Sequence, residues 1–324
     1  MRCFITLLIL LACQQAWTQN AVGLANLPVR NQPGKPTSVA ITPAEEPSVN
    51  SLIIPFNRVG NLIVIKGIVD TTEGNFIFDT GAPGLVLNLT YFRQYATTEV
   101  DERGSASGAV VGAVQTMVNR FSFGGLDFKN VKADMISLGH IEDRKGIKIL
   151  GLIGVSFFAD MDMVIDYEKS LIYLHRITKK ESNTYKNKML DSTSYSELEF
   201  DVIDNKMILY VKLGDRKMKF FIDTGAESNV LDSRLPNKVF ESITITGRTK
   251  MIGAGNKSVE ALYGNLKNMK FGDRELITLP FVITTLENVC ISELCCIDGI
   301  LGFEFLSLHK IGFNFIKRKM YIWK

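Results

Sequence analysis

Two short apolar stretches of the chain each contain an aspartate at a position where burying its charge costs free energy. Residues 76–82 read Phe-Ile-Phe-Asp-Thr-Gly-Ala, and residues 220–226 read Phe-Phe-Ile-Asp-Thr-Gly-Ala. In each copy the aspartate, Asp79 or Asp223, ends one apolar run and is followed within a few residues by a second apolar run. Because an unpaired buried charge is strongly unfavourable, each carboxylate must be hydrogen-bonded, paired or used in acid–base chemistry.

The surroundings of the two aspartates are repeated as well. The repeated features are predicted strands before each aspartate, at residues 62–69 and 207–213, and later apolar-apolar-glycine segments, at residues 149–154 and 297–302. Asp79 and Asp223 lie 144 positions apart, and Gly151 and Gly299 lie 148 positions apart, so the copies stay in register. A long repeat that is present only twice indicates a duplicated domain and not a solenoid.

The composition divides the chain into five segments. Met1 and Arg2 precede an apolar run at residues 4–12, which is typical of a secretory signal peptide and too short to remain as a membrane anchor. Five prolines between Pro28 and Pro47 indicate a flexible leader, with a propeptide as the alternative. The predicted segments are the signal peptide 1–18, the Pro-rich flexible leader 19–51, the N-terminal lobe 52–177, the polar linker 178–196 and the C-terminal lobe 197–324.

The signal segment predicts that the mature protein is exported, as a secreted, periplasmic or cell-surface protein. Residues 10–13, Leu-Leu-Ala-Cys, resemble a bacterial lipobox, which would make Cys13 a lipid anchor. Residues 16–18 offer a small-residue site for ordinary cleavage near Gln19 instead. Leu11 fits the lipobox poorly, so plain secretion is favoured. No second apolar stretch of membrane length follows, so we predict no integral membrane span.

The overall composition is that of an ordinary globular protein. With 324 residues, 46% hydrophobic and 22% charged, the chain is long enough for two domains with proper cores. The net charge of +3 is mild, and the basic residues are scattered. Because no basic stripe is interleaved with aromatic residues, the sequence argues against nucleic-acid binding.

The residues around both aspartates resemble the aspartic proteases, and more closely the retropepsin-like group. The resemblance covers residues 52–324 and rests on the apolar strands ending in Asp-Thr-Gly-Ala, the glycine-bearing hairpins and the later glycine segments. Ala82 and Ala226 match the retroviral pattern, whereas two lobes in one chain match the pepsin-like plan. The resemblance implies an all-β, mainly antiparallel fold of two acid-protease barrel lobes, with few short helices.

By this resemblance, Asp79 and Asp223 share one catalytic site. Two carboxyls about 3 Å apart cannot both ionise easily, so one keeps a proton and the pair titrates as a unit. The ionised carboxylate would take a proton from a water molecule while the protonated carboxyl hydrogen-bonds the scissile carbonyl oxygen. Because water is the nucleophile, the chemistry requires no metal, no cofactor and no Ser or Cys nucleophile.

The resemblance also implies roles for residues that support the aspartates, which are Thr80, Gly81, Ala82, Thr224, Gly225 and Ala226. The threonines would cross-link the two loops, and the glycine amides would face the carboxylates. The alanines, in place of Ser or Thr, would remove a hydrogen bond and favour a less acidic pH optimum. The other glycines are those of the threaded segments, Gly151, Gly154, Gly299 and Gly302, and those of two flap hairpins, Gly104, Gly108, Gly253 and Gly255, where plain turns are an equal alternative.

The remaining candidate ligands show no catalytic or metal-binding pattern. The three histidines are far apart in the sequence, and Cys290 with Cys295 and Cys296 lacks a fourth ligand at zinc-like spacing. We therefore predict no metal site. In an exported protein a short-loop disulfide from Cys290 to one of the adjacent pair, here assigned to Cys295, is expected, and it leaves one thiol over.

The residue after each Asp-Thr-Gly-Ala motif differs between the copies. Pro83 follows the first motif and Glu227 follows the second. Glu227 either adds a negative charge near the aspartates or faces solvent, and exposure is the commoner state of a glutamate.

The sequence thus predicts an exported aspartic endopeptidase that acts on peptide or protein substrates in extended conformation. The alternative is a non-catalytic peptide-binding module on the same fold, although a binding groove has no need of two buried carboxylates. A monomer with one intramolecular site is favoured, and a dimer that pairs equivalent lobes of two chains is the alternative.

Overall fold

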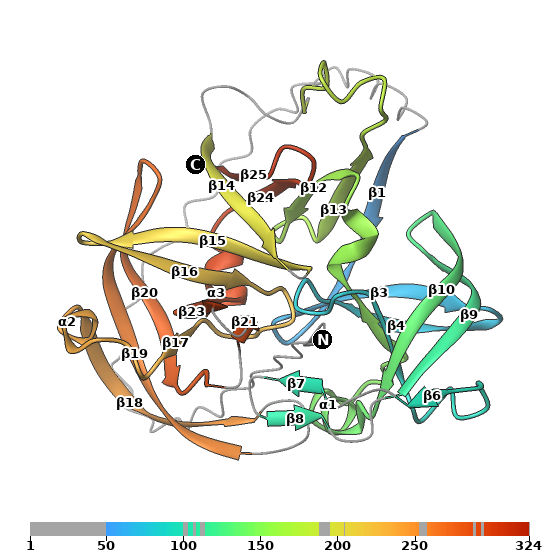
Figure 1. Cartoon of the computed structure of the whole chain (residues 1–324), viewed down its shortest axis with the longest axis horizontal. Coiled ribbons are helices and arrows are strands. Elements are labelled where there is room, and N and C mark those ends of the chain that lie inside the picture. Colours follow the sequence, from blue (N-terminus) through green and yellow to red (C-terminus); the bar gives the residue numbers. More distant parts are fainter. Residues whose placement is uncertain are drawn as a thin grey trace, which may run out of the picture.

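The computed structural model of the chain describes residues 50–99, 103–105, 108–110, 114–187, 195–203, 205–252, 258–287, 290–292 and 295–323. Strands dominate these residues (Figure 1), which confirms the predicted all-β, mainly antiparallel fold with few short helices. The helical elements are Gly139–Lys145 (α1), Asn237–Phe240 (α2), Phe303–Leu306 (α3) and the 3-10 helix Val155–Phe158 (η1). None of the helices in this part of the chain is long and apolar enough to cross a bilayer. The predicted signal peptide, Cys13 and residues 19–49 of the leader lie outside the described residues.

The first lobe is an eight-stranded sheet with the order β2-β3-β4-β11-β5-β10-β9-β6. Its strands are Asn57–Val59 (β2), Leu62–Val69 (β3), Thr72–Phe78 (β4), Leu85–Asn88 (β5), Thr98–Glu99 (β6), Val114–Phe123 (β9), Leu126–Ile136 (β10) and Gly151–Ile153 (β11). β3 also pairs with β9, with Gly67 opposite Phe123, so the sheet curves back on itself into a barrel. Arg103–Ser105 (β7) and Gly108–Val110 (β8) form a separate hairpin.

The second lobe repeats this strand order. Its strands follow as β15-β16-β23-β17-β20-β19-β18, which corresponds to β3-β4-β11-β5-β10-β9-β6, and β15 pairs with β19 as β3 pairs with β9. The strands are Lys206–Leu213 (β15), Arg216–Ile222 (β16), Val230–Asp232 (β17), Ile243–Ile252 (β18), Ser258–Phe271 (β19), Arg274–Thr284 (β20) and Gly299–Leu301 (β23). The sequence repeat is therefore a repeat of topology.

Six further strands, here called the inter-lobe sheet, join the lobes and lie above both of them in Figure 1. Their order is β1-β13-β12-β24-β25-β14, with the strands Ser51–Pro55 (β1), Met161–Asp166 (β12), Leu171–Arg176 (β13), Tyr195–Ile203 (β14), Ile311–Asn314 (β24) and Lys319–Trp323 (β25). β14 also pairs with β15, so these strands and those of the second lobe form one continuous 13-stranded sheet. The lobes meet where β12 runs antiparallel to β24, with Asp162 opposite Asn314. β14 begins within the predicted linker 178–196, whose bounds stay a prediction.

Buried aromatic side chains fill the core of each lobe. In the first lobe Phe121 packs against Phe76 and Phe157, with ring centroids 5.3 and 5.4 Å apart. In the second lobe Phe271 stacks on Phe305 with centroids 4.7 Å apart. Such rings contribute large apolar areas, so each lobe has a firm core behind its aspartate strand.

A polar cluster holds the segment after β13 against the inter-lobe sheet. Asp162 is 2% exposed, and its two oxygens accept hydrogen bonds from Asn187 Nδ2 at 3.0 Å and Asn314 Nδ2 at 3.2 Å. Next to it the His175 ring stacks on Tyr185, with centroids 4.5 Å apart. Burial raises the pKa of Asp162 to about 6, although the two asparagine hydrogen bonds oppose the rise.

We expect Asp162 to make the stability of the protein depend on pH. The native state binds its proton more tightly than the unfolded chain, so the free energy of unfolding falls as the pH rises from about 4 to about 6. The loss amounts to about 2 to 3 kcal/mol. Chemical denaturation of Asp162→Asn at several pH values should lack this component, whereas the exposed control Asp160→Asn should keep it. Parallel curves for Asp162→Asn and the natural protein would contradict this expectation.

Candidate active site

The two aspartates directly follow paired strands in the barrels. Asp79 follows β4 and Asp223 follows β16, and their side chains are 1% and 0% exposed. The backbone N–H of Asp79 donates to Ile153 O at 3.0 Å, and that of Asp223 donates to Leu301 O at 3.0 Å. Each aspartate is therefore anchored to the short strand that is threaded beside it.

Both threaded segments lie in equivalent places. β11 is parallel to β4 and antiparallel to β5, and β23 is likewise parallel to β16 and antiparallel to β17. The glycines of these segments pack against the aspartate loops at distances that exclude a side chain. A Cβ atom at Gly302 would lie 2.5 Å from Ala226 O, and one at Gly154 would overlap Ala82 O. Glycine is required there because the two backbones approach so closely.

Thr80 and Thr224 join the loops of the two lobes. The N–H of Thr80 donates to Thr224 Oγ1 at 2.9 Å, and the N–H of Thr224 donates to Thr80 Oγ1 at 3.0 Å. Each hydroxyl in turn donates across the interface, Thr80 to Ile222 O at 3.0 Å and Thr224 to Phe78 O at 2.9 Å. The N–H and hydroxyl groups of both threonines are thus all hydrogen-bonded, so the aspartates beside them are held in fixed relative positions.

We expect Thr224→Val to loosen this junction. Valine has the shape of threonine but leaves Thr80 N–H without an acceptor and Phe78 O without its donor, which costs about 1–3 kcal/mol for each buried group. Thr224→Ser keeps both hydrogen bonds and is the matched control. Thermal unfolding should separate the two variants, and equal melting temperatures would show that the hydrogen bonds contribute nothing.

The junction brings the two carboxyl groups into contact. The N–H of Gly81 donates to Asp79 Oδ1 and that of Gly225 donates to Asp223 Oδ1, both at 2.8 Å. Each carboxyl also lies against the glycine of the opposite loop, so the two carboxyls are close enough for the charge of one to act on the other. Asp223 Oδ2 is buried and has no hydrogen-bond partner among the described residues. This oxygen is therefore free to accept a proton or a water molecule.

Both carboxyl groups hold protons more strongly than ordinary aspartates. Burial raises the pKa of Asp79 to about 6, against the opposing effect of its backbone hydrogen bonds. Burial raises the pKa of Asp223 well above its ordinary value, and the negative charge of Asp79 raises it further. The two carboxyls therefore keep protons to a higher pH than ordinary aspartates, and they titrate as a pair.

Glu227 is buried, contrary to the expectation that it faces solvent. It is 6% exposed, and its Oε2 lies 2.6 Å from Lys145 Nζ, which comes from α1 of the other lobe. Asn61 N–H donates to the same oxygen at 3.2 Å, and Asn61 Nδ2 donates to Glu227 O at 3.1 Å. A counter-ion 82 positions away in the sequence makes burial of this carboxylate tolerable. No local pattern in the sequence predicts that Lys145 pairs with Glu227.

The candidate flap glycines are described in part. Gly104 lies in β7 and Gly108 in β8, opposite Ala109 and Ser105 in a two-stranded hairpin. Figure 1 places this hairpin and β18 at the side of the molecule away from the inter-lobe sheet. Gly253 and Gly255 fall between β18 and β19, outside the described residues.

The predicted disulfide also lies outside the described side chains. The backbone places Cys290 opposite Cys296 and Ser292 opposite Cys295, in the strands Cys290–Ser292 (β21) and Cys295–Cys296 (β22). Among the residues that the structure describes, no group of three or more His, Cys, Asp or Glu side chains is arranged to hold a metal ion.

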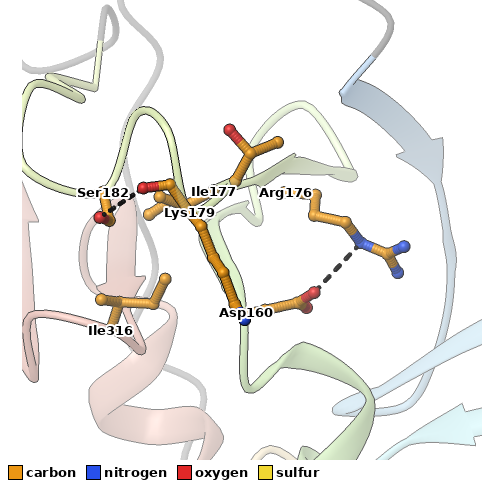
Figure 2. Close-up of a pocket in the computed structure, with 7 residues that line it drawn as sticks. Asp160, Arg176, Ile177, Lys179, Ser182 and Ile316 are labelled. Carbon is orange, nitrogen blue, oxygen red and sulfur yellow. Dashed lines mark hydrogen bonds and ion pairs between the residues drawn. The ribbon is translucent and has the colours of Figure 1, made fainter.

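A surface hollow of about 340 Å³ lies at the end of β13, where the predicted linker begins (Figure 2). Its polar contacts include the exposed ion pair of Asp160 and Arg176, at 3.3 Å, and the hydrogen bond from Ser182 Oγ to Lys179 O, at 3.0 Å. These groups are exposed and form no buried polar site, so we assign no function to this hollow.

The aspartyl protease family model matches residues 63–157 and 209–305, together more than half of the chain. Each matched region contains one Asp-Thr-Gly-Ala motif and one threaded glycine segment. The chain therefore belongs to the aspartyl protease family, in a tandem arrangement. Among solved structures, the crystal structure of aspartic proteinase from Irpex lacteus is similar, with 10% identity over 85% of this chain and 97% of that chain and a TM-score of 0.48. No curated protein sequence matches this chain significantly.

Proposed function

We propose that the protein is an exported aspartic endopeptidase in which Asp79 and Asp223 form the catalytic pair. The observation that carries the proposal is the contact between two buried carboxyls, one of which keeps an oxygen without a protein donor. Two acidic groups in one buried site destabilise the fold unless they share a proton, so chemistry is the best account of why both are present.

The two carboxyls share the catalytic roles. Because the pair titrates as a unit, one carboxyl keeps the shared proton and donates a hydrogen bond to the scissile carbonyl oxygen. The other carboxyl is ionised and accepts a proton from the attacking water molecule. The oxygen of that water bonds to the carbonyl carbon, and the leaving amine then takes a proton from the pair. The substrate is an extended peptide or protein segment.

The same groups predict the pH dependence of the activity. The singly protonated pair exists above the pKa of Asp79, which burial raises to about 6. Activity should therefore fall as the pH drops below about 6, because a second proton removes the general base. This agrees with the less acidic optimum that the alanines at positions 82 and 226 imply.

Export rests on the sequence of the N-terminal segment. A basic residue before an apolar run at residues 4–12 supports a cleaved signal peptide, and plain secretion accounts for it better than a lipid anchor at Cys13. The mass of the mature protein decides between these two routes, because a lipid anchor adds acyl chains to the new N-terminus.

The decisive test of the activity is cleavage of a mixed peptide library by purified protein that starts at Asn20, over a series from acidic to alkaline pH. We expect internal peptide bonds to be cut, with a loss of activity on the acid side near pH 6. Binding of library peptides without cleavage at any pH would overturn the proposal and favour a non-catalytic peptide-binding module.

A further inference from the structure

The duplicated lobes allow each position around the aspartates to be compared with its counterpart. In the C-terminal lobe, the N–H of Asn229, six residues after Asp223, donates to Glu304 Oε2 at 3.0 Å. The hydroxyl of Tyr263 in β19 donates to Glu304 Oε1 at 2.9 Å. Glu304 lies in α3, two residues after the threaded glycine Gly302. One carboxylate thus connects the loop that carries Asp223 with a strand of the β18–β19 hairpin.

Asn229 is itself held firmly. It is fully buried, its Oδ1 accepts from Gly302 N–H at 2.9 Å, and its Nδ2 donates to Pro280 O at 3.0 Å. Because Asn229 is fixed by these hydrogen bonds, a displacement of Glu304 would move the backbone of the Asp223 loop.

The N-terminal lobe has no such connection among its described residues. The strand registers make Gln115 the counterpart of Tyr263, and Gln115 Nε2 donates to Asp134 Oδ1 at 2.7 Å within the sheet instead. Leu85 takes the place of Asn229, and Ser156 takes the place of Glu304. Because the first lobe reaches the same geometry without these groups, the fold alone does not require them.

Tyr263 lies where the hairpin leaves the rest of the sheet. β19 pairs with β20 only as far as Leu262 opposite Ile283, and residues 258–261 pair with β18 alone. The strand at this point also packs, through Ala261, into the apolar cluster that contains Ala226 of the aspartate loop. Tyr263 therefore contacts Glu304 from the position where the hairpin leaves the rest of the sheet.

We propose that Tyr263 and Glu304 are positioning residues that couple the β18–β19 hairpin to the Asp223 loop. This connection holds the Asp223 loop in its working position, and the Asp79 loop depends on its own lobe. The inference rests on the proposed peptidase function. Burial raises the pKa of Glu304, which shows that its charged form is disfavoured at this position. A buried carboxyl of this kind is typical of a functional role.

The test uses Tyr263→Phe, which removes only the hydroxyl, and Glu304→Gln, which leaves a donor group facing Asn229 N–H or Tyr263. Ser156→Ala, at the position equivalent to Glu304, is the matched control. Hydrogen exchange of the unliganded protein should rise about tenfold in residues 223–232 and 258–264 of both variants and stay unchanged in residues 79–88, a factor that corresponds to about 1.4 kcal/mol. The control should change none of these segments.

Peptide cleavage gives the second readout. If the chain is active, Tyr263→Phe should lower kcat/KM about tenfold, with most of the change in kcat, because substrate contacts remain and the alignment of the aspartates is lost. Unchanged exchange in residues 223–232 of both variants would overturn the coupling, as would an equal rise in residues 79–88. Since exchange requires no turnover, an inactive chain with the expected exchange pattern would contradict only the peptidase function.

Discussion

Asp223→Asn is expected to lower the rate of peptide hydrolysis on the order of 10³-fold at every pH. The amide can neither hold the shared proton nor accept a proton from the attacking water. Asp79→Asn should cause a loss of similar size, because it too leaves only one titratable carboxyl in the site. Neither substitution changes the shape of the buried pair, so both variants should remain folded. Steady-state cleavage of a peptide taken from the library experiment measures the effect.

The same two variants are expected to gain stability at neutral pH. Burial raises the pKa of both carboxyls in the native state, so the native protein holds more protons than the unfolded chain and loses stability as the pH rises through these values. An asparagine does not titrate, so a variant that carries it does not lose stability in this way as the pH rises. Asp134→Asn, a buried aspartate bonded to Gln115 and distant in sequence from both motifs, is the control and should keep full activity. Reduced stability together with reduced activity in Asp223→Asn would indicate a structural role instead.

Lys145→Met is expected to destabilise the protein by about 3–5 kcal/mol, the usual cost of leaving one member of a buried ion pair without its partner. Lys145 and Glu227 side chains are 12% and 8% exposed, and Glu227 Oε1 has no hydrogen-bond partner among the described residues. After the substitution, Asn61 N–H alone would face the carboxylate. Because the pair joins α1 of one lobe to the aspartate loop of the other, loss of cooperativity between the lobes should accompany the loss of stability.

Chemical denaturation of a double-mutant cycle measures this effect. Adding Glu227→Gln to Lys145→Met removes the unpaired charge and should restore most of the stability. Lys319→Met is the control, since Lys319 pairs with the exposed Glu197 and Glu199 and its replacement should cost about 1 kcal/mol or less. A Lys145→Met variant no less stable than Lys319→Met would mean that the cross-lobe pair contributes nothing to the fold.

The features that sequence reasoning predicted are those encoded by neighbouring residues. Asp79 and Asp223 stand out because apolar runs flank each of them within a few positions, and the strand-ending glycines recur at nearly the same offset. This repeat predicts two similar barrels, each with one threaded segment, because the same elements are expected in both copies.

The features that it missed depend on contacts between distant residues. The inter-lobe sheet pairs Leu52 with Leu174, and no local pattern specifies which strands meet. Glu227 looked like a surface residue because its counter-ion Lys145 comes from a helix in the other lobe. The contact from Tyr263 to Glu304 likewise spans 41 positions and forms only when the C-terminal lobe is folded.

The central claim, that one chain contains one complete catalytic pair, is tested most directly by assaying Asp79→Asn and Asp223→Asn separately and then mixed in equal amounts. With an intramolecular pair, each variant is inactive, the mixture is inactive as well, and the natural protein sediments as a monomer. Activity of Asp79→Asn alone would show that the Asp223 lobes of two chains pair with each other. Activity that returns only on mixing would show that Asp79 of one chain works with Asp223 of another, and either result would contradict the account.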